Sequence, residues 1–229
     1  MSDQDFLLLQ TIFSLIGFIF AIIIAILVFQ KDRSYLLNKF FAIATLLLGL
    51  SSFSLAISNL PFLFDLMNGN ENSHLILSIQ FQFFFLLEAL FFYSLVGIIL
   101  LYGSERIDYT ILIIATLLSM INLLVVFMPG SIFVAENALA NTESNVAFKL
   151  IYYPIAVILY CFTLYCFFKT YRIADSDTKE KMQFILIGWV FGGTSLLLSV
   201  FNDIFRPLDL ISTLVLLLAT LFLYLGFRK

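Results

Sequence analysis

The chain has 229 residues, of which 62% are hydrophobic and 12% charged, and its mean hydropathy is +1.07. Values this high exclude a soluble globular domain, and a net charge of -3 gives no support to nucleic-acid binding. The composition predicts an integral membrane protein, in which lipid surrounds most of the side chains.

Seven apolar runs follow one another, each close to the ~20 residues that a membrane-spanning helix needs. They are predicted at residues 6–29, 40–60, 75–101, 110–128, 146–168, 182–201 and 208–227. Turn residues or charges separate the runs, and the gaps are too short for a separate soluble domain. We therefore expect a single all-α domain over residues 1–229, a seven-transmembrane helix bundle. The outer segments 62–74 and 129–145 are expected to fold back as short interfacial helices.

The distribution of lysine and arginine predicts the orientation, because cytoplasmic loops retain these residues during insertion. One side carries Lys149 and Arg206. The other side carries Lys31, Arg33, Lys39, Arg106, Lys169, Arg172, Lys179, Lys181, Arg228 and Lys229. We expect a multi-pass protein of the plasma membrane with its N-terminus outside and its C-terminus in the cytoplasm.

Glu88 lies about halfway along the third apolar run. Carboxyl groups at this depth are costly, and they mark a ligand or proton site or bond a neighbouring helix. Gln80 and Phe84 share its helix face at a spacing of four residues, which predicts a polar strip descending from the outer surface. Asn122 and Tyr160 are the candidate partners on other helices. Ligand or proton sensing and a purely structural role both stay open at this point.

The sixth run contains Gly188 and Gly192 one turn apart, followed by Gly193. Small residues at this spacing let helix backbones approach closely in a membrane. We expect this face to pack against another helix of the same chain or against a second copy.

The connection before the last run contains Arg206, followed by Pro207 and Asp209. Proline at the first turn and an acidic residue near the helix N-terminus are typical of a helix cap, which is the structural interpretation. The functional alternative is that Arg206 and Lys149 attract an anionic ligand at the outer surface.

Several cofactors are disfavoured by missing residues. The sole histidine, His74, lies in an outer loop, so a haem held by paired histidines between helices is not expected. The last run has no lysine to hold retinal. No metal-ligand cluster and no catalytic constellation occurs in the sequence, so we expect neither a cofactor nor an enzyme.

Three short motifs carry a resemblance to a known family. Asn38-Lys39-Phe40-Phe41 opens the second run, residues 181–188 open the sixth, and Leu223 to Lys229 close the seventh. This order of features resembles the N-terminal seven-transmembrane sensor region of bacterial and archaeal histidine kinases. In that family the last helix usually continues into a sensor or kinase domain, whereas this chain stops at Lys229. The resemblance implies a stand-alone sensory module or a fragment.

The leading hypothesis is a sensory or receptor module that relays an outer or membrane-accessible signal to a cytoplasmic partner. The connection from Lys169 to Lys181, together with Arg228-Lys229, would be its output surface. The first alternative is a structural or accessory subunit of a larger membrane complex. The second is a small transporter or channel, for which Glu88 is the evidence.

Overall fold

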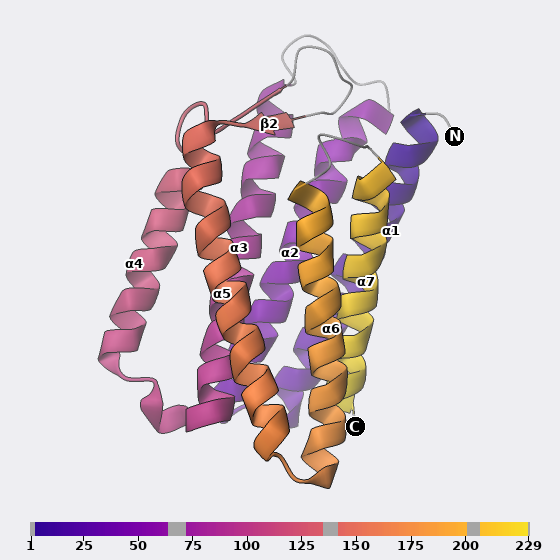
Figure 1. Ribbon diagram of the computed structural model, residues 1–229. Coiled ribbons are helices and arrows are strands. Elements are labelled where there is room, and N and C mark those ends of the chain that lie inside the picture. The colour runs from indigo at the N-terminus through magenta and orange to yellow at the C-terminus, as the bar shows by residue number, and fades with distance from the viewer. Residues whose placement is uncertain (1–2, 64–71, 135–141, 201–206, 229) are drawn as a thin grey trace.

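The computed structural model describes residues 3–63, 72–134, 142–200 and 207–228. Over these residues the chain forms seven α-helices, which correspond in order to the seven apolar runs of the sequence (Figure 1). They are α1 (Asp3–Lys31), α2 (Leu36–Leu63), α3 (Asn72–Tyr102), α4 (Tyr109–Val126), α5 (Val146–Ile173), α6 (Ser176–Val200) and α7 (Pro207–Arg228). The prediction of a helical architecture is confirmed.

Within the described residues, five helices have the length and apolar composition to cross a bilayer, namely α1 to α5. In α7 the apolar stretch Leu210–Gly226 is shorter, and α6 carries charged residues in its first two turns. Large apolar side chains on α1, α4 and α5 face outward, as at Ile19, Leu124 and Ile158. Exposing such side chains costs free energy in water but not in lipid, so this is a helical membrane protein.

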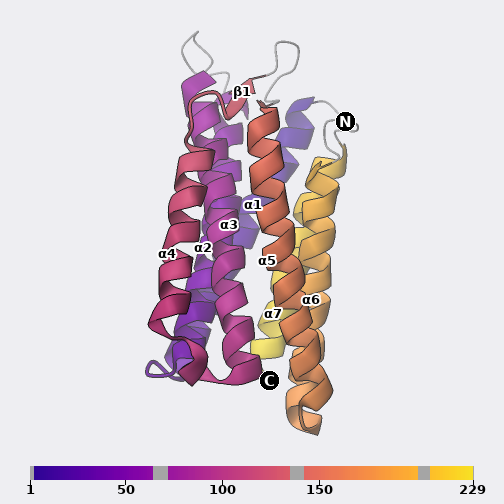
Figure 2. The same ribbon diagram turned by 60° about the vertical axis from the view of Figure 1, so that its left-hand side comes forward.

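Six of the helices form a closed ring. Going around it, α1 is followed by α2, α3, α5, α6 and α7, and α7 packs back against α1. α4 lies outside this ring and packs chiefly against α3 and α5 (Figure 2). Its outer face is open, with Leu124 70% exposed. α4 is therefore attached along one face, whereas each ring helix is held from two sides.

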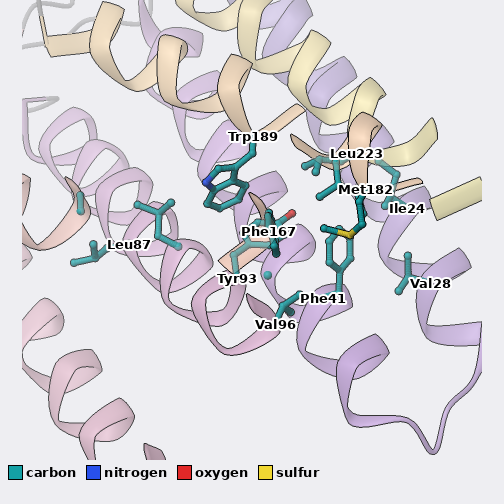
Figure 3. Close-up of a cluster of buried hydrophobic side chains, with 14 of the residues drawn as sticks. Ile24, Val28, Phe41, Leu87, Tyr93, Val96, Phe167, Met182, Trp189 and Leu223 are labelled. Carbon is teal, nitrogen blue, oxygen red and sulfur yellow. The ribbon is translucent and has the colours of Figure 1, made fainter. Parts of the chain in front are cut away.

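The centre of the ring is a core to which all seven helices contribute. Trp189 of α6 lies at its middle, with Tyr93 of α3 and Phe167 of α5 beside it (Figure 3). The Trp189 ring centroid is 4.9 Å from that of Tyr93 and 5.4 Å from that of Phe167, both edge-on. Edge-to-face contacts of this kind add directional attraction to dispersion, so they fix how these three helices meet.

Hydrogen bonds between buried side chains join neighbouring ring helices. Thr45 of α2 and Tyr93 of α3 share a hydrogen bond of 3.0 Å between their hydroxyl oxygens. Three further bonds of this kind are Asn59 to Gln10 between α2 and α1 at 3.1 Å, Ser94 with Thr163 between α3 and α5 at 2.9 Å, and Ser195 with Ser212 between α6 and α7 at 3.0 Å. Because lipid tails are as apolar as the helix surfaces, such bonds and close packing select the partners of each helix.

The described parts of the connection between α4 and α5 pair as two short strands, which contradicts the expected interfacial helix at 129–145 in those parts. β1 (Ile132–Val134) pairs antiparallel with β2 (Thr142–Ser144), after a turn in which Gly130 has φ 75°. β-Branched side chains favour a strand over a helix in so short a segment. The second expected interfacial helix, at 62–74, is largely outside the described residues, since α2 extends to Leu63 and α3 begins at Asn72.

Asp175 caps the start of α6. Its Oδ1 accepts from the backbone N–H of Thr178 at 2.9 Å, and hydrogen bonds from Thr178 hold the pKa of this exposed carboxyl below its ordinary value. Because the pKa of Asp175 is lower in the folded protein, the cap stabilises the fold fully at pH values above the ordinary pKa of an aspartate. This stabilisation is lost as the pH falls through the lowered pKa of the folded state. Asp175→Ala is expected to lower the Tm at neutral pH, and this difference from the wild type should shrink as the pH falls through the lowered pKa of Asp175. Asp175→Asn, which caps without titrating, is the control: its Tm difference from the wild type should stay small at neutral pH.

Candidate functional site

A row of polar contacts runs along the interface between α3 and α4. Three α3 positions one turn apart meet three α4 positions on one face, in antiparallel order. We call this row the α3–α4 seam, and its residues are Gln80, Phe84 and Glu88 on α3 and Ser119, Asn122 and Val126 on α4.

Glu88 is the centre of the seam. The Ser119 hydroxyl donates to Glu88 Oε2 at 2.8 Å, and Asn122 Nδ2 donates to Glu88 Oε1 at 2.9 Å. The same amide nitrogen also donates to the Phe84 carbonyl at 3.2 Å. Glu88 is 8% exposed and Asn122 is 2% exposed. A carboxyl group thus lies in the interior with hydrogen-bond donors from the neighbouring helix, as burial of a polar group requires.

Gln80 closes the end of the seam that lies next to β1. Its Nε2 donates to the carbonyl of Val126 at 2.9 Å and contacts the Ser131 hydroxyl at 3.3 Å. Ser131 Oγ donates to the same carbonyl at 2.7 Å. Val126 is the last residue of α4, so its carbonyl has no partner within the helix. Gln80 and Ser131 therefore satisfy the C-terminal end of α4 and fix its position against α3.

Acceptors exceed donors at the seam. Asn122 Oδ1 is buried, and among the described residues it has no hydrogen-bond partner. The two Glu88 oxygens each receive one bond, although each has room for two. A site with this imbalance favours a species that brings donors, such as a proton, a hydroxyl group or an ammonium group.

Tyr160, which the sequence grouped with Glu88, lies in a different interface. Its hydroxyl donates to the Trp189 carbonyl at 3.0 Å, and Trp189 Nε1 donates to the Tyr160 carbonyl at 3.3 Å. The two rings stack with centroids 5.5 Å apart. Tyr160 thus joins α5 to α6 and takes no part in the α3–α4 seam.

The three glycines of α6 face different surroundings. A Cβ at Gly188 would lie 2.8 Å from the carbonyl oxygen of Ala219 in α7, and a Cβ at Gly193 would overlap the Tyr160 ring of α5. At Gly192 no described atom beyond its own helix and adjacent residues would lie within 4 Å. The close approaches are thus made by Gly188 and Gly193, toward two helices of the same chain.

Sequence reasoning missed two contributors to this region. Ser119 lies three residues before Asn122 and therefore on the same helix face, a spacing that contained the signal. Tyr152 of α5 donates its hydroxyl to the Phe83 carbonyl at 2.7 Å, next to the seam. Nothing in the sequence indicates this second contact, because it depends on which helices are neighbours.

The suggested outer anion site is only partly described. Lys149 is exposed in the first turn of α5, while Arg206 lies outside the described residues. Within the described ranges, no group of three or more His, Cys, Asp or Glu side chains is placed to hold a metal ion.

No protein-family model matches the chain, and a search of curated proteins finds no match. The resemblance to histidine-kinase sensor regions therefore stays a prediction.

Proposed function

We propose that the chain is a sensory module that crosses the plasma membrane seven times, with its N-terminus outside and its C-terminus in the cytoplasm. α1 begins at one end of the bundle and α7 ends at the other, as an odd number of crossings requires (Figure 1). The α1–α2, α3–α4 and α5–α6 connections lie at the same end as the end of α7 (Figure 1). These connections and the helix ends beside them carry most of the lysine and arginine, which supports a cytoplasmic location for that end.

The observation that carries the proposal is a buried site, rich in hydrogen-bond acceptors, between α3 and α4. Of these two helices, α4 is attached to the bundle along one face only. A donor that reaches Asn122 Oδ1 or Glu88 adds bonds across the α3–α4 seam and favours one position of α4 over another. A ligand shifts a conformational equilibrium only by its difference in affinity between two states. The unpartnered Asn122 oxygen supplies such a difference, since it is satisfied in the occupied state alone.

A continuous set of contacts links the seam to the basic end of the bundle. Tyr152 joins α5 to α3 beside the seam, and Tyr160 joins α5 to Trp189 of α6 further along. α5 and α6 then meet in the connection from Lys169 to Lys181. In this proposal a shift of α4 changes the α3–α5 packing, and the α5–α6 connection presents the change to a cytoplasmic partner.

Glu88→Gln tests the sensory role. Glutamine keeps the side-chain length but cannot exchange a proton or attract an ammonium group as a carboxylate does. Spin labels at Tyr109→Cys, at the exposed start of α4, and at Tyr35→Cys, before α2, report the position of α4 relative to the ring. The background carries Cys161→Ser and Cys166→Ala. The wild-type distance distribution is expected to shift when methylammonium is added or when the pH is lowered, and that of Glu88→Gln to stay fixed.

Glu105→Gln is the control, because Glu105 is an exposed carboxylate in the short 3-10 helix η1 (Ser104–Arg106) between α3 and α4. It should shift like the wild type. Identical distributions for the wild type under all conditions would contradict the proposal. Glu88-dependent ion flux into liposomes would favour a transporter or channel instead, and a stable stoichiometric membrane partner without any α4 movement would favour an accessory subunit.

A further inference from the structure

An apolar groove lies on the outer surface between α5 and α6, away from the α3–α4 seam. It has a volume of about 620 Å³ and is lined by side chains of both helices, among them Cys161, Tyr165 and Phe168 of α5 and Val190 and Phe191 of α6. Tyr165, Phe168 and Val190 are each about half exposed, so the groove is open toward the surrounding lipid.

Two cations lie at one end of the groove, on the faces of rings that line it. The Arg172 guanidinium lies 5.1 Å from the Phe168 ring centroid, and Lys169 Nζ lies 5.7 Å from that of Tyr165. Contact with an aromatic face holds a cation in place without neutralising its charge. Lys169 Nζ also lies 5.9 Å from the Tyr102 ring centroid of α3. Positive charge is thus fixed next to a hydrocarbon-lined surface.

The α5 side of this end of the groove is basic. The last three turns of α5 carry Lys169 and Arg172 and no acidic residue. Asp175 follows the end of α5, and its Oδ1 accepts from the Thr178 backbone at the start of α6. The positive charges on the aromatic lining of the groove therefore come from α5 itself.

We propose that this groove binds one anionic phospholipid, with an acyl chain along the apolar lining and the phosphate against Arg172 and Lys169. A phospholipid joins a hydrocarbon tail to an anionic headgroup. The groove offers a matching arrangement, an apolar lining with two cations at one end. Arginine binds phosphate oxygens through two parallel N–H groups, and basic pockets at helix ends recognise anionic headgroups. The inference depends on membrane embedding and goes beyond the sensory role, whose proposed signal site is the α3–α4 seam, although Lys169 and Arg172 also begin the connection proposed as the output.

A second protein copy fits the groove less well, because an apolar partner surface would strip water from both cations without supplying a counter-charge. A neutral lipid fills the apolar part but leaves the cations without an anion. The anionic headgroup is therefore the distinguishing element, and the test compares lipids that differ in the headgroup alone.

Val190→Trp provides the first measurement, because it adds an indole at a half-exposed position that lines the groove, where bromine on an acyl chain quenches its fluorescence. Trp189, the sole tryptophan of the wild-type chain, is buried in the ring core and contributes a constant background. The protein is placed in phosphatidylcholine bilayers that contain a small fraction of either brominated phosphatidylglycerol or brominated phosphatidylcholine. The anionic brominated lipid is expected to quench more strongly, and each of Lys169→Gln and Arg172→Gln to weaken that preference by about fivefold.

The matched control is Arg33→Gln. Arg33 also lies over a phenylalanine, 6.0 Å from the Phe29 ring centroid, at the end of α1 on the same side of the bundle. This variant removes the same net charge from that side and should leave the lipid preference unchanged. Equal quenching by both brominated lipids, or equal effects of Arg33→Gln and Arg172→Gln, would overturn the proposal.

The rate of chemical labelling at Cys161 gives a second readout, which does not depend on tryptophan fluorescence. It lines the groove and is exposed, whereas Cys166, the other cysteine of the chain, is buried. Labelling of Cys161 by a membrane-permeant maleimide is expected to slow when phosphatidylglycerol is added, and Arg172→Gln is expected to abolish the slowing. If wild-type labelling is the same with and without phosphatidylglycerol, no anionic lipid occupies the groove and the proposal is wrong.

Discussion

Gly188→Ala is expected to destabilise the bundle by about 1–3 kcal/mol. The added Cβ would lie 2.8 Å from the carbonyl oxygen of Ala219 and 3.1 Å from the backbone nitrogen of Leu223. Both atoms belong to the α7 backbone, which cannot yield by a change of rotamer. α6 and α7 must therefore separate, and the Ser195–Ser212 hydrogen bonds lengthen with them. Unfolding in mild detergent, followed by near-ultraviolet circular dichroism, measures the loss.

Gly192→Ala is the matched control, one turn further along the same helix. No described atom beyond its own helix and adjacent residues would lie within 4 Å of its Cβ, so alanine replaces glycine without a clash. Since alanine favours a helix over glycine, the expected change is neutral or a gain of up to about 1 kcal/mol. Equal destabilisation by the two substitutions would show that α6 and α7 do not approach closely at Gly188.

Glu88→Leu is expected to lower the free energy of unfolding by about 1–2 kcal/mol. Leucine removes the acceptors that bind Ser119 and Asn122, so the buried Asn122 amide keeps a single bond, to the Phe84 carbonyl. Asn122→Leu is expected to have a similar effect, because it removes a donor from the Glu88 carboxyl. The double variant Glu88→Leu/Asn122→Leu should regain most of the loss, since leucines on both sides leave neither group unsatisfied.

The same double variant separates packing from sensing. If Glu88 serves packing alone, the double variant restores both the stability and any response of α4 position to pH or methylammonium. If Glu88 receives the signal, the stability returns and the response does not. Additive losses in the two single variants and the double variant would contradict a direct contact between Glu88 and Asn122.

The apolar runs predicted the helices well because spanning length and hydropathy are properties of single segments. The runs at 40–60 and 75–101 correspond to α2 and α3; α2 is longer by four residues at its start and three at its end, and α3 by three residues at its start and one at its end. The polar strip on α3 was likewise visible in the sequence, since Gln80, Phe84 and Glu88 repeat at the helical period. The structure adds that all three meet the same neighbour, α4.

Features that depend on helix neighbours were not predictable from the sequence. Asn122 and Tyr160 were equal candidates for Glu88 by depth, yet α4 brings Asn122 to the carboxyl and α5 carries Tyr160 to Trp189. The spacing of Gly188 and Gly192 suggested one shared packing face. Which side of a helix meets another backbone is decided by the ring order, and local spacing contains no information on that order.

The ring closes through contact between α1 and α7, the first and last helices of the chain. During synthesis, α1 enters the membrane long before α7 has been translated, so the flank of α1 that α7 covers stays bare in the interval. Five intervening helices must then be in place before the two ends of the polypeptide meet. A ribosome that stalls before residue 207 would leave an open arc of helices, in which the flanks of α1 and α6 that α7 covers have no partner and are prone to misassembly.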